Sequence, residues 1–210
     1  MVNIMQYIRF RELFKDYTVY SLSDIRSVDP RFHRRRLNDW QEKGYIKKVI
    51  KGYYTFADHA TNEEMLFEIA NRIYTPSYIS FEMAFSFYGF IPEAVYGLTS
   101  ATSRPTRTFA TPVGEFLYRT IKAELFFGYN IVEYNRGHHF DIASPEKAVL
   151  DYFYLNSSLK KPDDFESIRF DGHSFFKHVK ENIFFEYLDR FKNKSLAKRI
   201  NTFWSFMKNA

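Results

Sequence analysis

The chain has 210 residues and a formal net charge of +5, with 45% hydrophobic and 26% charged residues. This composition is typical of a folded globular protein and excludes a disordered or fibrous chain. Its apolar clusters are far shorter than the roughly 18 residues that cross a bilayer, and its start lacks the pattern of a signal peptide. We therefore expect a cytoplasmic protein, and the absence of cysteine excludes disulfides and thiol chemistry.

The positive charge is concentrated near the start of the chain. Residues 1–60 contain 12 lysines and arginines against seven acidic residues, whereas residues 61–210 contain 18 of each. A compact basic segment is typical of a surface that binds phosphates, although a solvated lysine-rich face is the alternative. The asymmetry predicts two domains, residues 1–60 and residues 61–210.

The first sixty residues begin with the patterns of two short helices. In "NIMQYIRFRELFKD", helical spacing places four apolar side chains toward a core, namely Ile4, Ile8, Phe10 and Phe14. In "SLSDIRSV", either Ser21 or Ser23 is a candidate N-cap for a second helix.

A third helix is predicted in "DPRFHRRRLNDWQEKG", over about 14 residues between an Asp29 cap and a stop at Gly44. Pro30 would take the first helical position, where its missing N–H costs nothing. At about 100° per residue, one face of this helix carries the anchoring side chains, which are His33, Leu37 and Trp40. The opposite face carries the polar and basic side chains, which are Arg31, Arg34, Arg35 and Asn38.

The segment "YIKKVIKGYYTF" predicts two strands joined at Gly52. Three helices followed by a basic hairpin are the order of a winged helix-turn-helix, in which the second helix of the motif enters the major groove. Arginine pairs there with guanine and asparagine with adenine, while basic residues of the wing hold phosphates. The predicted DNA-binding residues are Arg31, Arg34, Arg35 and Asn38 in the groove, and Lys47, Lys48 and Lys51 on the backbone. The alternatives are a charged surface helix and a winged module that binds protein.

Residues 61–210 predict an α+β domain that follows the winged module. Thr61 precedes an apolar run at capping-box spacing, and a second helix is predicted between Ser80 and Gly89. Residues 95–140 are rich in β-branched and aromatic residues broken by turn formers, which predicts strands. Helices resume at Ser144 and continue to the end. The predicted fold is a larger domain of helices and an antiparallel sheet.

Motifs that would indicate an enzyme are missing. The sequence has no "GxxxxGK[ST]", "GxSxG" or "HExxH", and we expect neither catalysis nor a cofactor. His138 and His139 stand near Asp141, but adjacent strand residues face opposite ways, so only one histidine can share a pocket with Asp141, and no metal site is predicted. Glu146 and Lys147 resemble the acidic and basic set of a metal-dependent nuclease, yet they lie at a helix start instead of on a strand.

Three segments carry a resemblance to a known family. "SYISFEMAFSFYGFIPE", "TSRPTRTFATPVGEFLYRTIKAELFFGY" and "IASPEKAVLDYFYL" follow the basic module in the order seen in AbiEi-type antitoxins of type IV toxin-antitoxin systems, which the chain resembles over nearly its whole length. The resemblance implies a transcriptional autorepressor that binds inverted repeats in its own promoter. It also implies a second domain that counteracts a nucleotidyltransferase-like toxin without forming a stable complex with it.

Three hypotheses therefore stand side by side. The first is a DNA-binding repressor with an antitoxin domain, acting as a monomer or a homodimer on DNA and not on a membrane. The second is a nucleic-acid enzyme that uses the winged module as an adaptor, which a metal-dependent activity would favour. The third is a protein-interaction module, which a complete lack of DNA binding would favour.

Overall fold

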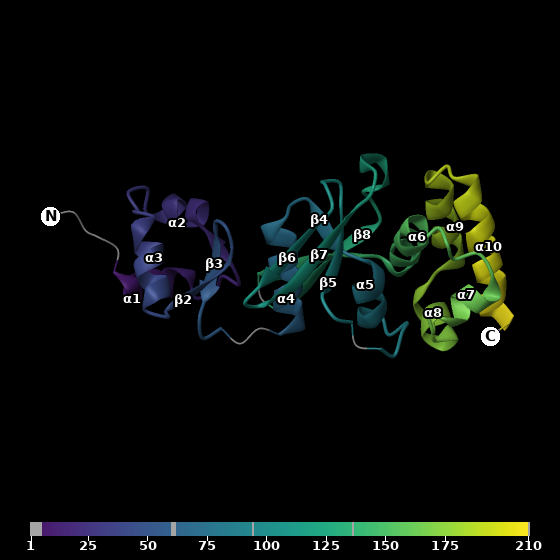
Figure 1. Ribbon diagram of the computed structural model, residues 1–210, viewed down its shortest axis with the longest axis horizontal. Helices are drawn as coiled ribbons and strands as arrows, with labels where there is room; N and C mark the ends of the chain where they lie inside the picture. Colours follow the sequence, from purple (N-terminus) through teal and green to yellow (C-terminus); the bar gives the residue numbers. More distant parts are fainter. Residues whose placement is uncertain (1–5, 60–61, 94, 136, 210) are drawn as a thin grey trace.

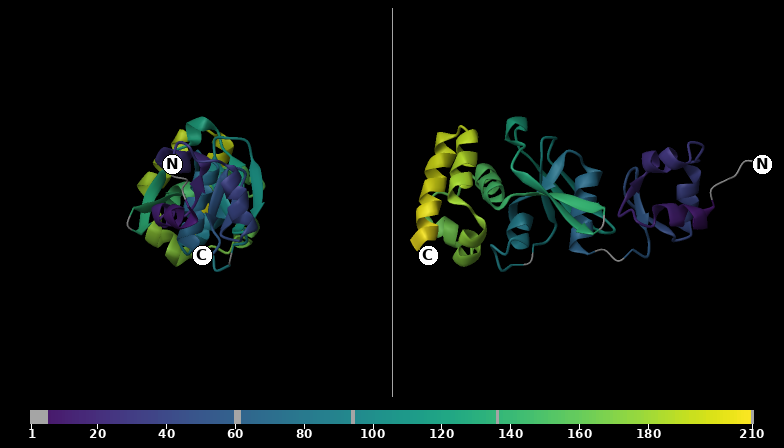
Figure 2. Two further views of the ribbon diagram at one scale, coloured as in Figure 1. Left: turned by 90° about the vertical axis from the view of Figure 1, so that its left-hand side faces the viewer. Right: turned by 180° about the vertical axis from the view of Figure 1, so that it is seen from behind.

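A computed structural model describes residues 6–59, 62–93, 95–135 and 137–209. The fold is mixed α+β with two sheets. The molecule is elongated, with a small helical and β segment at one end, a large sheet in the middle and a group of helices at the other end (Figure 1). Seen along this long axis, the same elements overlap in a compact cross-section (Figure 2).

The N-terminal segment has three helices and a three-stranded antiparallel sheet in the order β1-β3-β2. The helices are α1 (Tyr7–Phe14), α2 (Leu22–Val28) and α3 (Arg35–Glu42), and the strands are β1 (Tyr20–Ser21), β2 (Ile46–Ile50) and β3 (Tyr53–Phe56). Ser21 is the N-cap of α2, since its hydroxyl accepts from the Asp24 N–H and the Asp24 carboxylate accepts from the Ser21 N–H. The predicted hairpin is confirmed, and Gly52 adopts the left-handed backbone (φ +94°) that its turn requires.

Phe10 and Phe14 of α1 are fully buried, as predicted. Ile8 was wrongly placed in the core, because its side chain is 71% exposed. Phe10 is two positions further along the helix, which puts the two side chains about 200° apart around it. Ile4 lies outside the described residues.

The start of the third helix differs from the prediction. Helix α3 begins at Arg35, whereas the sequence predicted Pro30, and Asp29 and Phe32 form a turn in which the Phe32 N–H donates to the Asp29 carbonyl at 2.9 Å. Phe32 is 3% exposed and packs on Phe10 and Trp40. In one continuous helix, Phe32 would lie about 140° from Leu37, so the turn lets both side chains be buried. His33, predicted as an anchor, is exposed for the same reason.

The large sheet has six strands in the order β6-β7-β5-β4-β9-β8. They are β4 (Ser77–Ile79), β5 (Leu98–Thr102), β6 (Arg107–Thr111), β7 (Gly114–Thr120), β8 (Tyr129–Asn135) and β9 (His138–Ala143), with a short 3-10 helix η1 (Ala123–Leu125) before β8. The prediction of an antiparallel sheet was wrong in part. The pair β5–β7 is parallel, because β7 returns from the edge strand β6 to insert beside β5, and the pair β4–β9 is parallel as well.

Helices cover this sheet and form the far end of the molecule. They are α4 (Glu63–Ile73), α5 (Phe81–Phe87), α6 (Pro145–Leu155), α7 (Pro162–Glu166), α8 (Gly172–His178), α9 (Glu181–Arg190) and α10 (Lys194–Asn209). The predicted helix starts at Ser80 and Ser144 are confirmed. The predicted cap Thr61 lies outside the described residues, and the Asn62 side chain accepts from the Met65 N–H at the start of α4. No helix in the described ranges is long and apolar enough to cross a membrane.

Buried side chains form two clusters. The smaller lies among α1, α2, α3 and the hairpin and contains Trp40, while the larger lies around the six-stranded sheet and the C-terminal helices and contains Trp204. Val19 and Val49 belong to the larger cluster although they come from the N-terminal segment. Arg72 of α4 also pairs with Asp24 of α2 at 3.2 Å, so a seam of apolar and ionic contacts joins the two segments.

Candidate nucleic-acid interface

Two buried side chains set the rotation of α3 about its axis. Leu37 is fully buried and Trp40 is 7% exposed, both as predicted. The Trp40 ring lies with its centroid 4.6 Å from that of Phe10 and 5.5 Å from that of Tyr7. Because these contacts hold one side of the helix, the other side faces solvent, and α3 lies at the end of the molecule away from the large sheet (Figure 1).

The four residues predicted for the groove are all exposed. Arg35 and Asn38 lie on α3, and Arg34 is its N-cap residue. Arg31 precedes the helix, in the turn where its N–H donates to the Asp29 carboxylate at 3.2 Å. The structure therefore places these side chains around the N-terminal end of α3, although they do not share one long helical face.

The three predicted backbone contacts come from the hairpin, and each is exposed. Lys48 lies opposite Tyr54, on the sheet face that carries the smaller cluster, whereas Lys47 lies opposite Thr55 on the other face. Lys51 occupies the turn. Lys48 therefore lies on the face of the sheet that packs on the helices, Lys47 faces away from them, and Lys51 lies at the tip of the hairpin.

The cations of this surface have no carboxylate partners in the part of the chain that the structure describes. Within the described ranges, no ion pair is formed by Arg31, Arg34, Arg35, Lys47, Lys48 or Lys51. Arg11 of α1, by contrast, is held by both oxygens of Asp58 at 3.0 and 2.7 Å. We call the exposed, unpaired set of Arg31, Arg34, Arg35, Asn38, Lys48 and Lys51 the basic surface.

The histidine pair of β9 divides between two surroundings. His138 Nδ1 lies 3.0 Å from a Glu68 carboxylate oxygen that also accepts from the Tyr134 hydroxyl at 2.6 Å. Burial would raise the pKa of Glu68, but the neighbouring polar groups of Thr18, Tyr134 and His138 outweigh burial and hold that pKa below its ordinary value. His139 lines a hollow with Asp141 that Glu68 also borders, so one histidine shares a pocket with Asp141, as predicted. The described residues contain no group of three metal ligands.

Sequence reasoning missed a fully buried ion pair on α6. Lys147 and Asp151 are both inaccessible to solvent and form a salt bridge. The Lys147 ammonium also donates to the Tyr78 hydroxyl at 2.9 Å, while Tyr78 and Ser80 donate to Asp151 at 2.9 and 3.0 Å. Burial lowers the pKa of Lys147 and raises that of Asp151, and their mutual attraction opposes both shifts. The spacing of a lysine and an aspartate four residues apart in an apolar helix was the available signal.

The residues that resemble a nuclease set do not come together. Glu146 accepts from the backbone N–H of Lys180 at 2.8 Å, which ties α6 to the start of α9. Lys147 bonds to Tyr78 and Asp151, and Asp141 lines the hollow beside His139. Each of the three therefore has a different surrounding.

No protein-family model and no curated protein matches the chain. The basic surface is thus defined by geometry and charge alone.

Proposed function

We propose that residues 1–60 form a winged helix-turn-helix that binds duplex DNA, and that the protein is a transcriptional repressor. In this proposal α2 and α3 are the helix-turn-helix pair, α3 enters the major groove, and the β2–β3 hairpin is the wing. The observation that carries the proposal is the basic surface, because its cations have no carboxylate partners in the described ranges and are free to bind phosphates and guanine.

We further propose that residues 61–210 act as the antitoxin of a type IV system, on the strength of the family resemblance. Two of the resembling segments meet in the fold, since "SYISFEMAFSFYGFIPE" supplies Tyr78 and Ser80, and "IASPEKAVLDYFYL" supplies Lys147 and Asp151. The shared motifs thus contribute to one buried polar network. This network joins the two resembling segments into one scaffold. We assign the antitoxin activity to no single residue of that scaffold.

The DNA proposal is tested with the full chain and a duplex that contains its own promoter. The triple variant Arg31→Ala, Arg34→Ala, Arg35→Ala is compared with a control of equal net charge, Lys160→Ala, Lys177→Ala, Lys180→Ala. Affinity is measured at several salt concentrations. We expect strong, salt-dependent binding that only the arginine variant loses. Equal losses in both variants would show a general charge effect and would contradict the assignment.

The antitoxin proposal is tested in cells that express the cognate nucleotidyltransferase-like toxin. The arginine triple variant should still rescue growth while failing to repress, because its second segment is unaltered. Protein levels are matched by immunoblot. Loss of rescue at equal protein level would show that DNA binding and antitoxicity depend on the same residues.

A further inference from the structure

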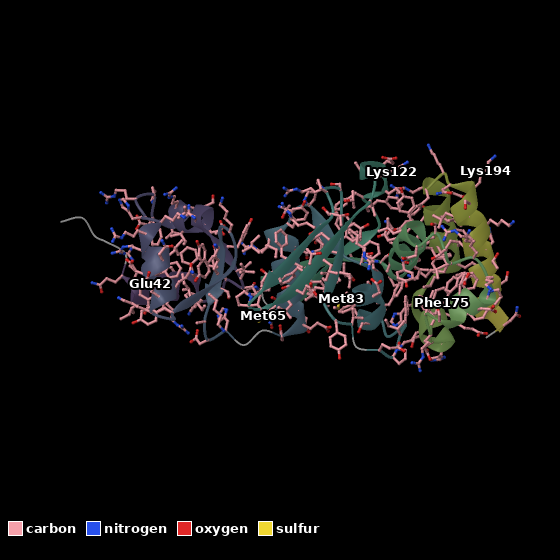
Figure 3. All side chains as sticks on the ribbon, viewed as in Figure 1. Glu42, Met65, Met83, Lys122, Phe175 and Lys194 are labelled. Carbon is pink, nitrogen blue, oxygen red and sulfur yellow. The ribbon has the colours of Figure 1, made fainter. Side chains whose placement is uncertain are left out.

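A cavity of about 400 Å³ opens at the far end of the molecule from α3. Its walls come from the turn after β7, the ends of α6 and α9, and the start of α10, and three lysines line it, namely Lys122, Lys192 and Lys194. Figure 3 shows Lys194 at the helical end of the molecule, opposite to Glu42 of α3, and Lys122 above the large sheet, on the side nearer to Lys194. The cavity is therefore separate from the basic surface.

The charge of this cavity is strongly unbalanced. Glu124 is the carboxylate among its lining residues, and it lies 3.9 Å from the Lys122 ammonium, with both side chains mostly exposed. Lys192 and Lys194 form no ion pair with any residue in the described ranges. Two ammonium groups of one concave site thus have no carboxylate within ion-pair distance among the residues that the structure describes. A ligand that carries several negative charges would supply the counter-charge.

The backbone that carries these lysines is held in place. The Asn193 side chain accepts from the Leu196 N–H at 3.0 Å and so fixes the start of α10. Phe191 is 7% exposed, and its ring centroid lies 5.5 Å from that of Tyr154. Lys192 and Lys194 thus lie on a segment that these contacts anchor, and the half-buried ring of Tyr154 forms part of the wall. The first turn of α10 carries a positive electrostatic potential, which adds to that of the lysine side chains.

We propose that this cavity binds a ligand with linked phosphate groups, such as a nucleoside triphosphate or inorganic triphosphate. Lysine ammoniums are compact charges that bind phosphate oxygens without a fixed geometry, which suits a chain of phosphates lying between Lys122 on one side and Lys192 and Lys194 on the other. The Tyr154 ring offers a surface for a base. The site does not depend on the DNA-binding proposal.

Isothermal titration of the full chain with inorganic triphosphate, ATP and adenosine tests the proposal. We expect saturable 1:1 binding of the first two ligands and none of adenosine. The variant Lys122→Ala, Lys192→Ala, Lys194→Ala should lose roughly tenfold or more in affinity, since it removes charge-assisted hydrogen bonds. The control Lys160→Ala, Lys177→Ala, Lys180→Ala removes the same charge from outside the cavity and should bind as the unaltered chain does.

A comparison of ATP with inorganic triphosphate shows whether the base contributes to binding. Tighter binding of ATP than of triphosphate would assign a role to the base, while equal binding would assign recognition to the phosphates alone, and either result supports the site. Absence of saturable binding, or equal loss in the control, would overturn it. The DNA affinity of the cavity variant should be unchanged, so failure here is distinguishable from failure of the DNA proposal.

Discussion

Arg34 and Asn38 differ from Lys48 in what each is expected to contribute to DNA binding. Arg34→Ala or Asn38→Ala should each cost roughly 1–3 kcal/mol at particular base pairs, because bidentate contacts to a base edge are lost. Lys48→Ala should weaken all sequences alike and reduce the salt slope by about 1. Competition binding with a panel of altered operators measures both effects. Lys47→Ala is the matched control, since Lys47 lies on the other sheet face. A uniform loss for Asn38→Ala would contradict its role in base recognition.

The contributions of Lys147 and Asp151 to the free energy of unfolding should depend strongly on each other. Lys147→Met leaves a buried, unpaired carboxylate and should cost about 3–5 kcal/mol, whereas Lys147→Met with Asp151→Leu should recover most of that loss. Denaturant unfolding measures these differences, and the exposed Lys177→Met is the control. Equal stability of the single and double variants would contradict the coupling.

The loss of stability in the Lys147→Met variant should also depend on pH. Without its ammonium partner, Asp151 keeps the effect of burial, which is opposed by the hydrogen bonds from Tyr78 and Ser80 but raises its pKa in the folded state above the unfolded value. A carboxyl group with a raised folded pKa binds its proton more tightly when folded, so it costs stability as the pH rises through that range. The deficit should therefore shrink as the pH is lowered toward about 4.

Helix α3 depends on its aromatic anchor. Trp40→Ala removes a ring packed on Phe10, Tyr7 and Phe32 and should destabilise the N-terminal segment by about 3–5 kcal/mol. Ile8→Ala, on the exposed side of α1, should have little effect. Thermal unfolding followed by circular dichroism measures both. An unchanged melting curve for Trp40→Ala would mean that α3 is held by other contacts.

The elements with local signals were predictable from the sequence, and those set by distant contacts were not. Ser21, Ser144 and Gly52 have caps and turn chemistry that act within a few residues, and their helices and hairpin are confirmed. The burial of Leu37 and Trp40 followed from helical period alone. The start of α3 did not follow from helical period, because the position of Phe32 is set by packing on Phe10, twenty-two positions earlier. Where the local sequence is compatible with both a turn and a helix, such tertiary contacts determine which of the two forms.

Strand β4 shows the same limit in the large sheet. "SYI" is too short to carry a strand pattern, and it becomes a central strand because β5 and β9 pair with it from both sides. The parallel pairing of β5 with β7 likewise depends on where β6 lies, which no local pattern contains. For the candidate site, the exposure of the predicted side chains is confirmed, but the opposite facing of Lys47 and Lys48 emerged only with the register of β2.

At the scale of the whole molecule, the boundary between the basic and the neutral part of the sequence does not coincide with the boundary between the two buried clusters. The excess charge lies in residues 1–60, yet Val49 from the hairpin is 4% exposed in the larger cluster. Val49→Ala should therefore cost roughly 1–3 kcal/mol of stability, from the loss of buried apolar area. Val28→Ala is a matched control because Val28 is 48% exposed. Chemical denaturation compares them, and equal effects would mean that the seam contributes no stability.

The chain has two tryptophans, Trp40 and Trp204, and they lie in different clusters. Each single-tryptophan protein, made by Trp40→Phe or Trp204→Phe, therefore has an intrinsic fluorophore that reports on one end of the molecule. Since Val19 and Val49 tie the N-terminal segment to the larger cluster, the two emission changes should occur at the same denaturant concentration. In the Val49→Ala background the transition seen by Trp40 should move to lower denaturant than the one seen by Trp204, so fluorescence can follow the coupling between the N-terminal segment and the C-terminal helices without any added label.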